Sequence, residues 1–159
     1  MIHVETSTRI DRPVEDVFAY VDDLSRMSEW IDILAESTAS ESPTRVGTRV
    51  DNRVHLLGRN FQNTLEVVER EPGRRMVLRT ERPFAVQATF ELEAAEGGTV
   101  FSVVLEAQPG ASSFFKLGEP ILTGVGRRRF KGHLRRLKKR LEAGGVALEN
   151  QEIPLKAGI

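Results

Sequence analysis

The order of hydrophobic patterns along the chain limits its fold more than any other feature. Residues 3–10 alternate as in a strand, and residues 11–31 show helical spacing. Residues 33–106 return to alternation, and from residue 112 the spacing is helical again as far as residue 143. A sheet and a helix must each bury an apolar face. The order therefore predicts an α+β protein in which a curved antiparallel sheet grips one long C-terminal helix.

The segment after the first strand carries signals for two short helices. Asp11 is expected to cap the first helix, with Pro13 in its first turn. A second helix is expected over residues 24–31, ending near Trp30, because apolar residues there recur at helical spacing.

The middle of the chain predicts a series of hairpins. Residues 46–57 and 60–69 form two strands joined at Gly58, and further strands follow at 75–81, 84–93 and 99–106. Period-two alternation assigns one face of each strand to the interior. The side chains expected inside are Val46, Thr48, Val50, Asn52, Val54, Leu56, Phe61, Asn63, Leu65, Val67, Met76, Leu78, Thr80, Phe84, Val86, Ala88, Phe90, Leu92, Phe101, Val103 and Leu105.

The last helix has an apolar stripe, and proline and glycine residues lie near its two expected ends. Pro120 leaves two possibilities, a helix that starts near Gly118 or a longer helix that kinks. Gly144 and Gly145 are expected to end it. We therefore expect one domain over residues 1–143 and a loosely held tail over residues 144–159.

Composition excludes several kinds of chemistry. The chain has no cysteine, so disulfides, zinc–thiolate sites, iron–sulfur clusters and thiol catalysis are absent. The three histidines lack the spacing of a metal site, and we predict neither a metal nor a cofactor. The first residues lack the pattern of a signal peptide, which favours a cytoplasmic protein. For the oligomeric state, a monomer and a homodimer both stay open.

Several short motifs occur in an order known from one superfamily. They are DRPVEDVF at residues 11–18, Trp30, VGTR at 46–49, LGR at 57–59, VVEREPG at 67–73, Gly98–Thr99 and LRRLK at 134–138. Over residues 2–142 this layout resembles the START-like, helix-grip proteins, particularly the polyketide cyclase/dehydrase-like (SRPBCC) group. The resemblance implies six to seven strands wrapped round the last helix. It also implies a function among aromatase/cyclases and binders of lipids or hormones, a group with no common catalytic motif.

A sheet wrapped round one helix tends to leave a cavity between them. Its expected wall is apolar, with a few neutral hydrogen-bonding groups, so a hydrophobic small molecule is the predicted ligand, lipid or polyketide-like. The alternative is a filled core. The candidate ligand-binding residues are Trp30, Asn52, Phe61, Asn63, Thr80, Phe90, Phe101, Leu117, Ile121 and Val125.

Candidate acids and bases are scarce, and we predict no catalytic residue. His55 has the outward parity of its strand, His3 is near the terminus, and His133 lies in a basic helix, so all three are expected in solvent. Tyr20 is expected to be packed or at the surface. The chain is therefore more typical of a carrier or sensor than of an enzyme. A cyclase or dehydratase of a polyketide-like substrate is the main rival, and it requires a titratable group inside the cavity.

Charge is unevenly distributed along the chain. Residues 127–140 hold nine of the 23 Lys and Arg and no acid, although the chain as a whole is neutral. This run, from Arg127 to Arg140, predicts a solvated helix face. An interaction module that binds an anionic surface is the third functional alternative. Nucleic acid is a poor fit because few aromatic residues accompany the basic ones.

Overall fold

The computed structural model describes residues 1–56, 58–108 and 119–158, and for 119–123 and 144–158 it describes the backbone alone. Strand β1 (Ile2–Ile10) is followed by α1 (Val14–Asp22), the 3-10 helix η1 (Leu24–Arg26) and α2 (Met27–Trp30). The other elements are β2 (Leu34–Ala39), β3 (Arg49–Leu56), β4 (Arg59–Glu71), β5 (Arg75–Thr80), β6 (Ala85–Ala95), β7 (Gly98–Gln108) and α3 (Glu119–Gly158). This is the predicted order of elements.

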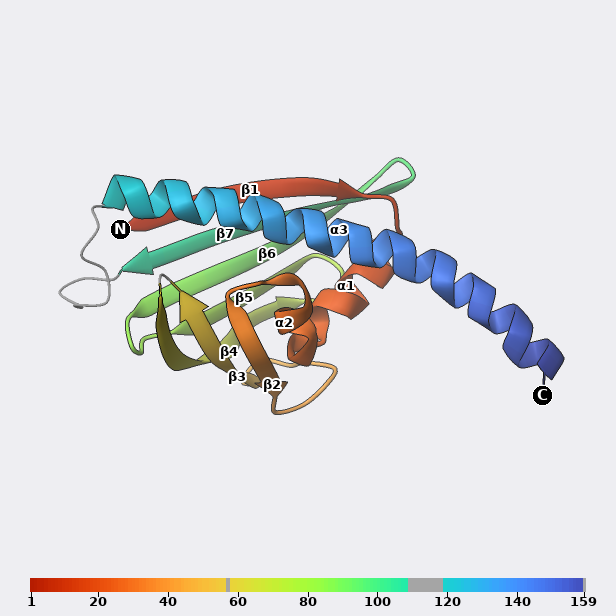
Figure 1. Ribbon diagram of the computed structural model, residues 1–159, viewed down its shortest axis with the longest axis horizontal. Coiled ribbons are helices and arrows are strands. Elements are labelled where there is room, and N and C mark those ends of the chain that lie inside the picture. Colours follow the sequence, from red (N-terminus) through yellow and green to blue (C-terminus); the bar gives the residue numbers. More distant parts are fainter. Residues whose placement is uncertain (57, 109–118, 159) are drawn as a thin grey trace.

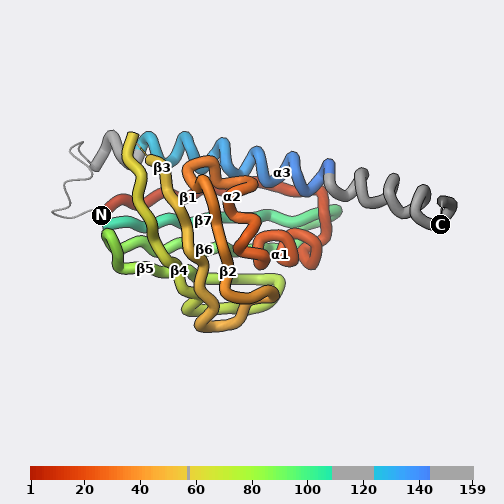
Figure 2. Tube along the Cα trace, turned by 60° about the horizontal axis from the view of Figure 1, so that its bottom comes forward, coloured from red at the N-terminus to blue at the C-terminus, as the bar shows by residue number. Residues whose placement is uncertain are grey.

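Seven strands form one antiparallel sheet in the order β1-β7-β6-β5-β4-β3-β2. The sheet is strongly curved, and in Figure 2 strands β2 and β3 run across the direction of β6 and β7. Helix α3 lies along β1, on the side of the sheet where α1 and α2 also lie (Figure 1). The fold is therefore the expected helix grip, with two short helices after the first strand.

The alternation of side chains along the strands places the core as the sequence predicted. In β3, Val50, Asn52 and Val54 are buried and the residues between them are exposed. Val46 is the exception. It was expected on the inner face but is 61% exposed, because β3 begins only at Arg49 and a loop with Gly47 at φ 100° precedes it.

The start of α1 differs from the expectation. Pro13 occupies the N-cap position without a side-chain hydrogen bond, and its carbonyl oxygen accepts the backbone amides of Asp16 and Val17. Asp11 does not cap the helix. Its backbone amide donates to Glu142 of α3, and its carboxylate accepts a bond from Arg9. The turn therefore ties β1 to α3 instead of starting α1.

Helix α3 continues past Gly144 and Gly145, so the predicted end there is wrong. Interior glycine lowers helix stability by about 1 kcal/mol but does not forbid the conformation. Pro120 is the second residue of α3, where its missing amide breaks no helical hydrogen bond. Residues 112–118 of the expected helical pattern lie outside the described residues. The division into a domain over 1–143 and a tail stays a prediction.

A dense core fills one end of the space between sheet and helix. Trp30 is fully buried, with its ring centroid 5.7 Å from Phe90 and 6.0 Å from Phe101. Leu137 and Leu141 of α3 are buried in the same cluster. We call this region the packed end.

A buried ion pair belongs to the same end. The Asp22 carboxylate lies 3.2 Å from Nε of Arg70 and accepts the amide and hydroxyl of Thr44. The guanidinium of Arg70 also covers the ring of Phe18 at 5.2 Å. These contacts join α1, β4 and the loop before β3.

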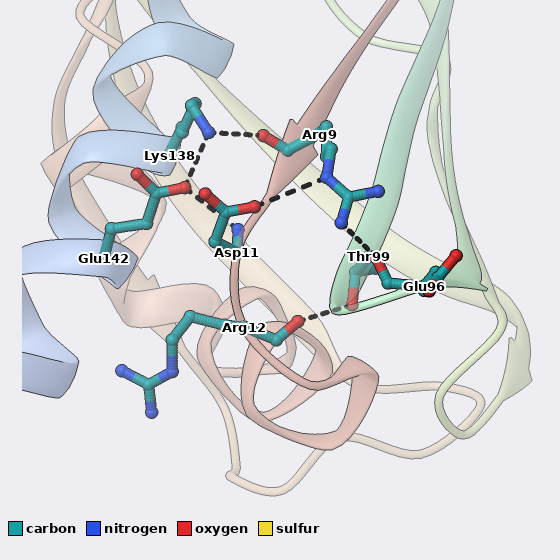
Figure 3. A network of polar contacts seen from close by, with 7 residues as sticks. All are labelled: Arg9, Asp11, Arg12, Glu96, Thr99, Lys138 and Glu142. Carbon is teal, nitrogen blue, oxygen red and sulfur yellow. Dashed lines mark hydrogen bonds and ion pairs between the residues drawn. The ribbon is translucent and has the colours of Figure 1, made fainter.

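A polar network fixes α3 to the sheet beside the packed end (Figure 3). Lys138 Nζ donates to the backbone carbonyl of Arg9 at 2.7 Å and to Glu142 at 2.6 Å. Arg9 in turn donates to the carbonyl of Glu96, in the turn between β6 and β7. The network joins α3 to the end of β1 and to the β6–β7 turn, so this part of the helix is held at a fixed place on the sheet.

Candidate functional site

A cavity of ≈170 Å³ lies between the curved sheet and the part of α3 that precedes the packed end. Strands β1, β3, β4, β6 and β7, the α2–β2 connection and α3 all contribute to its wall. Only four of the described lining residues are polar: Asn52, Asn63, Arg129 and His133. We call this region the cavity end. A space of this size resembles cavities of about 150 Å³ that hold a single benzene ring.

Five of the predicted ligand-binding residues line this cavity. Asn52, Phe61, Asn63 and Phe90 reach it from the sheet, and Val125 reaches it from α3. The sequence placed these four strand residues on the inner face by alternation and Val125 by helical spacing. Contact between these side chains and a ligand stays a prediction.

The other five candidates do not contribute to the described wall. Trp30 and Phe101 are fully buried in the packed end, where α2 closes against the sheet. Thr80 is buried, but its hydroxyl bonds the backbone of Arg82 and closes the connection after β5. The side chain of Ile121 and the whole of Leu117 lie outside the described residues.

The two cavity asparagines are linked to each other across β3 and β4. Asn52 accepts a hydrogen bond from Ser37 Oγ at 2.7 Å and donates from Nδ2 to Asn63 Oδ1 at 3.2 Å. Both ends of the Asn52 side-chain amide, Oδ1 and Nδ2, are therefore hydrogen-bonded inside the protein. These amides give the wall local polarity without adding a charge.

The position of His133 differs from the expectation. It was expected in solvent, but it is 1% exposed and lines the cavity. Its Nε2 atom lies 2.7 Å from Asp32 Oδ1, and its ring packs edge-on against Phe130 at 4.8 Å between centroids. Its Nδ1 atom is buried and has no hydrogen-bond partner among the described residues.

Burial controls the protonation of this pair. Burial is the largest effect on the pKa of His133 and lowers it. The charges of Arg136 and Arg129 lower the pKa further, so that it lies below the ordinary value although the hydrogen bond and charge of Asp32 raise it. For Asp32, partial burial raises the pKa. The His133 hydrogen bond and the nearby charges of His133, Arg129 and Arg136 together lower it, so that its net pKa is below the usual range. At neutral pH the pair is a neutral imidazole beside a carboxylate.

That protonation state determines the tautomer of His133. A carboxylate only accepts hydrogen bonds, so the proton of the neutral ring must lie on Nε2, facing Asp32. Nδ1 then carries a lone pair and can only accept. An acceptor left unsatisfied in an apolar site costs about 1–3 kcal/mol.

A sequence signal for the burial of His133 existed. His133 follows Phe130 by three residues and precedes Leu137 by four, which places it on the apolar stripe of α3. Its basic neighbours in the sequence conceal this signal. Asp32 had no signal, because its contact with His133 spans 101 residues of sequence.

The other histidines and the basic run behave as predicted. His55 is exposed and its Nδ1 lies 2.6 Å from Asn60 Oδ1, and His3 is exposed beside Glu5 and Glu106. Of the basic residues in 127–140, Lys138 is half-buried and the others are exposed. Arg129 and Arg140 reach acids of the α2 region, Asp32 and Glu29.

The described part of the chain lacks two further features. No group of three or more His, Asp or Glu side chains gathers there as a metal site would require. No helix in that part combines the length and apolarity needed to cross a bilayer.

A curved sheet that closes on a helix around an apolar cavity defines the class of START-like ligand-binding folds. Residues 1–142 match the family model described as polyketide cyclase/dehydrase and lipid transport. The chain therefore belongs to this family. No curated protein sequence matches it significantly.

Solved structures support the fold. A protein from Thermus thermophilus has a TM-score of 0.74 at 16% identity, with 89% of this chain and 98% of the other covered. A START superfamily protein from Mycobacterium smegmatis has a TM-score of 0.72 at 13% identity, covering 89% and 97%. The di-domain ARO/CYC StfQ of the steffimycin biosynthetic pathway has a TM-score of 0.71 at 17% identity, covering 91% of this chain and 51% of StfQ. At these identities the likeness shows the fold alone.

Proposed function

We propose that this protein binds a small, mainly apolar molecule in the cavity between the sheet and α3, as a carrier or sensor. The observation that carries the proposal is the wall, in which all but four of the described lining residues are apolar or glycine. Burying apolar ligand surface there is favourable by about 25 cal/mol per Å². The lipid-transport part of the family description agrees with such a role.

The size of the cavity narrows the ligand class. At ≈170 Å³ it is smaller than the roughly 300–1,000 Å³ typical of pockets for drug-sized ligands. It suits one aromatic ring with small substituents or a short branched chain. A polyketide of several fused rings requires the sheet and α3 to separate further than they do in this structure.

Native mass spectrometry of gently purified protein tests the proposal, followed by solvent extraction and mass analysis of whatever is released. We expect a stoichiometric apolar adduct. The matched control is Ala88→Leu, which fills part of the cavity from β6 and should lose the adduct. A bare wild-type protein that also ignores a panel of small aromatic and aliphatic compounds would contradict the proposal.

Acid–base catalysis is a second candidate, and the cavity position of His133 specifically favours it. A neutral imidazole whose second nitrogen is bonded to a carboxylate is the arrangement of a general base held in one tautomer. The cyclase/dehydrase part of the family description suits such a group. The substrate has to be as small as the ligand proposed above.

Hydrogen–deuterium exchange at the α-carbon of acetophenone tests this second candidate without knowledge of the natural substrate. The base removes an α-proton to give an enolate, and solvent deuterium replaces the proton. Wild-type protein should accelerate exchange at least about tenfold over His133→Phe, a modest demand on a positioned base. Equal rates for the two proteins, with acetophenone shown to bind both, would exclude this activity.

A further inference from the structure

Among the described residues that line the cavity, only His133 has a fully buried side-chain nitrogen or oxygen atom without a hydrogen-bond partner. Nδ1 of His133 is buried and unpartnered, while Nε2 of the same ring is held 2.7 Å from Asp32. The other polar groups of the wall have partners. Asn52 and Asn63 bond each other, and Arg129 lies 3.5 Å from Asp32.

From this arrangement we propose that His133 Nδ1 is the anchor for the bound molecule and accepts a hydrogen bond from a hydroxyl or N–H group of the ligand. The inference rests on the proposed function, because it identifies the ligand class for the same cavity. The ligand is then a small apolar molecule with one donor group, such as a phenol, an enol or an alcohol. A pure hydrocarbon leaves Nδ1 unsatisfied.

The orientation of the His133 ring indicates that Nδ1 accepts a hydrogen bond and does not donate one. Asp32 accepts from Nε2–H, which leaves only a lone pair at Nδ1. Phe130 packs against the ring edge-on and limits its rotation. The pair therefore presents an acceptor of fixed direction, and it distinguishes a donor group from an ether or a methyl group.

Two probes of nearly equal shape test the inference. The probes p-cresol and p-xylene differ by a hydroxyl in place of a methyl group, and each suits the cavity volume. In wild-type protein we expect p-cresol to bind at least as tightly as p-xylene in calorimetric titration. In His133→Phe the hydroxyl loses this acceptor, so affinity for p-cresol should fall at least about tenfold relative to p-xylene.

A neighbouring variant provides the matched control. Val125→Ala changes the same wall, on the same helix, without removing the acceptor. It should change the affinities for both probes by a similar factor. If His133→Phe also weakens both probes equally, His133 only shapes the wall and the inference is wrong.

Imidazole ¹⁵N NMR on the wild-type protein gives a readout that does not depend on how any variant folds. In the free protein we expect Nε2 protonated and Nδ1 unprotonated. Saturating p-cresol should shift the Nδ1 resonance in the direction of hydrogen-bond acceptance, and p-xylene should not. Binding of both probes with an unchanged Nδ1 resonance would overturn the inference and leave the proposed function intact. Binding of neither probe would overturn both.

Discussion

The two ends of the space between sheet and helix differ in how completely they are filled. At the packed end Trp30 and Phe101 pack against Phe90, whose ring also lines the cavity, and α3 is fixed through Lys138 and Glu142. At the cavity end, the same helix lines a cavity of ≈170 Å³ with Val125, Gly126, Arg129, Phe130 and His133. Both ends are apolar. One part of the helix therefore holds the fold together, and another part lines the cavity.

Removing the largest side chain of the packed end should have the largest effect. We expect Trp30→Ala to lower the free energy of unfolding by about 3–5 kcal/mol, because a fully buried aromatic leaves a void that the close-packed surroundings cannot fill. Chemical denaturation measures this loss. Trp30→Phe, which keeps a ring, should lose less. A loss below about 1.5 kcal/mol for Trp30→Ala would mean that this end is not tightly packed.

The buried ion pair of the packed end comes next. Asp22→Asn should lower the free energy of unfolding by about 2–4 kcal/mol, because it leaves Arg70 without a charge partner in a largely buried site. A double-mutant cycle with Arg70→Met isolates the pairwise coupling. If the two losses simply added, the pair would contribute nothing of its own.

Substitutions that enlarge a buried side chain should affect stability differently at the two ends. Val103→Leu adds one carbon at the packed end and should cost about 1–2 kcal/mol through overpacking. Ala88→Leu adds three carbons at the cavity wall and should change stability by less than about 1 kcal/mol, because the void accepts them. Affinity for p-xylene should fall at least about tenfold in Ala88→Leu alone. Equal stability losses would mean that the cavity collapses in solution.

The smallest expected effect is a pH dependence of the free energy of unfolding, caused by the titration of His133. The folded pKa of His133 is lowered, so the unfolded chain binds the proton first as the pH falls through the ordinary histidine value of about 6.5. Stability should therefore decrease from about pH 8 to about pH 5.5. Asp32 titrates in a separate window, below its usual range.

Urea denaturation midpoints over this pH range measure how stability depends on pH. In His133→Phe the part of this dependence that comes from His133 should be absent. The other two histidines remain in the variant and serve as an internal control. A wild-type stability that rises as the pH falls relative to the variant would show that the Asp32 interaction outweighs burial, and that His133 is charged in the folded protein.

The sequence predicted most of the fold because the decisive signals are local. Alternation in β3 to β7 and the turn glycines Gly58 and Gly73, both with positive φ, locate the strands and hairpins. The errors have physical causes. Val46 continues the alternation although the strand has not yet begun, and Asp11 looks like a cap because its bond to α3 is not visible in the sequence.

The site was less predictable than the fold. Alternation identified Asn52, Phe61 and Asn63 as inward, but it did not distinguish a cavity wall from a filled core. Trp30 and Phe101 have the same inward character and lie in the packed end. The His133–Asp32 pair depends on tertiary packing between α3 and the segment after α2, which no local pattern encodes.

Methyl NMR during a titration with p-xylene tests the central claim, that the cavity end is a binding site and the packed end is not. The account predicts saturable shifts of the Ala88, Ala107 and Val125 methyl resonances, and little change at Leu137 and Leu141. Shifts of similar size at both ends, or none at the cavity end at saturating p-xylene, would contradict it.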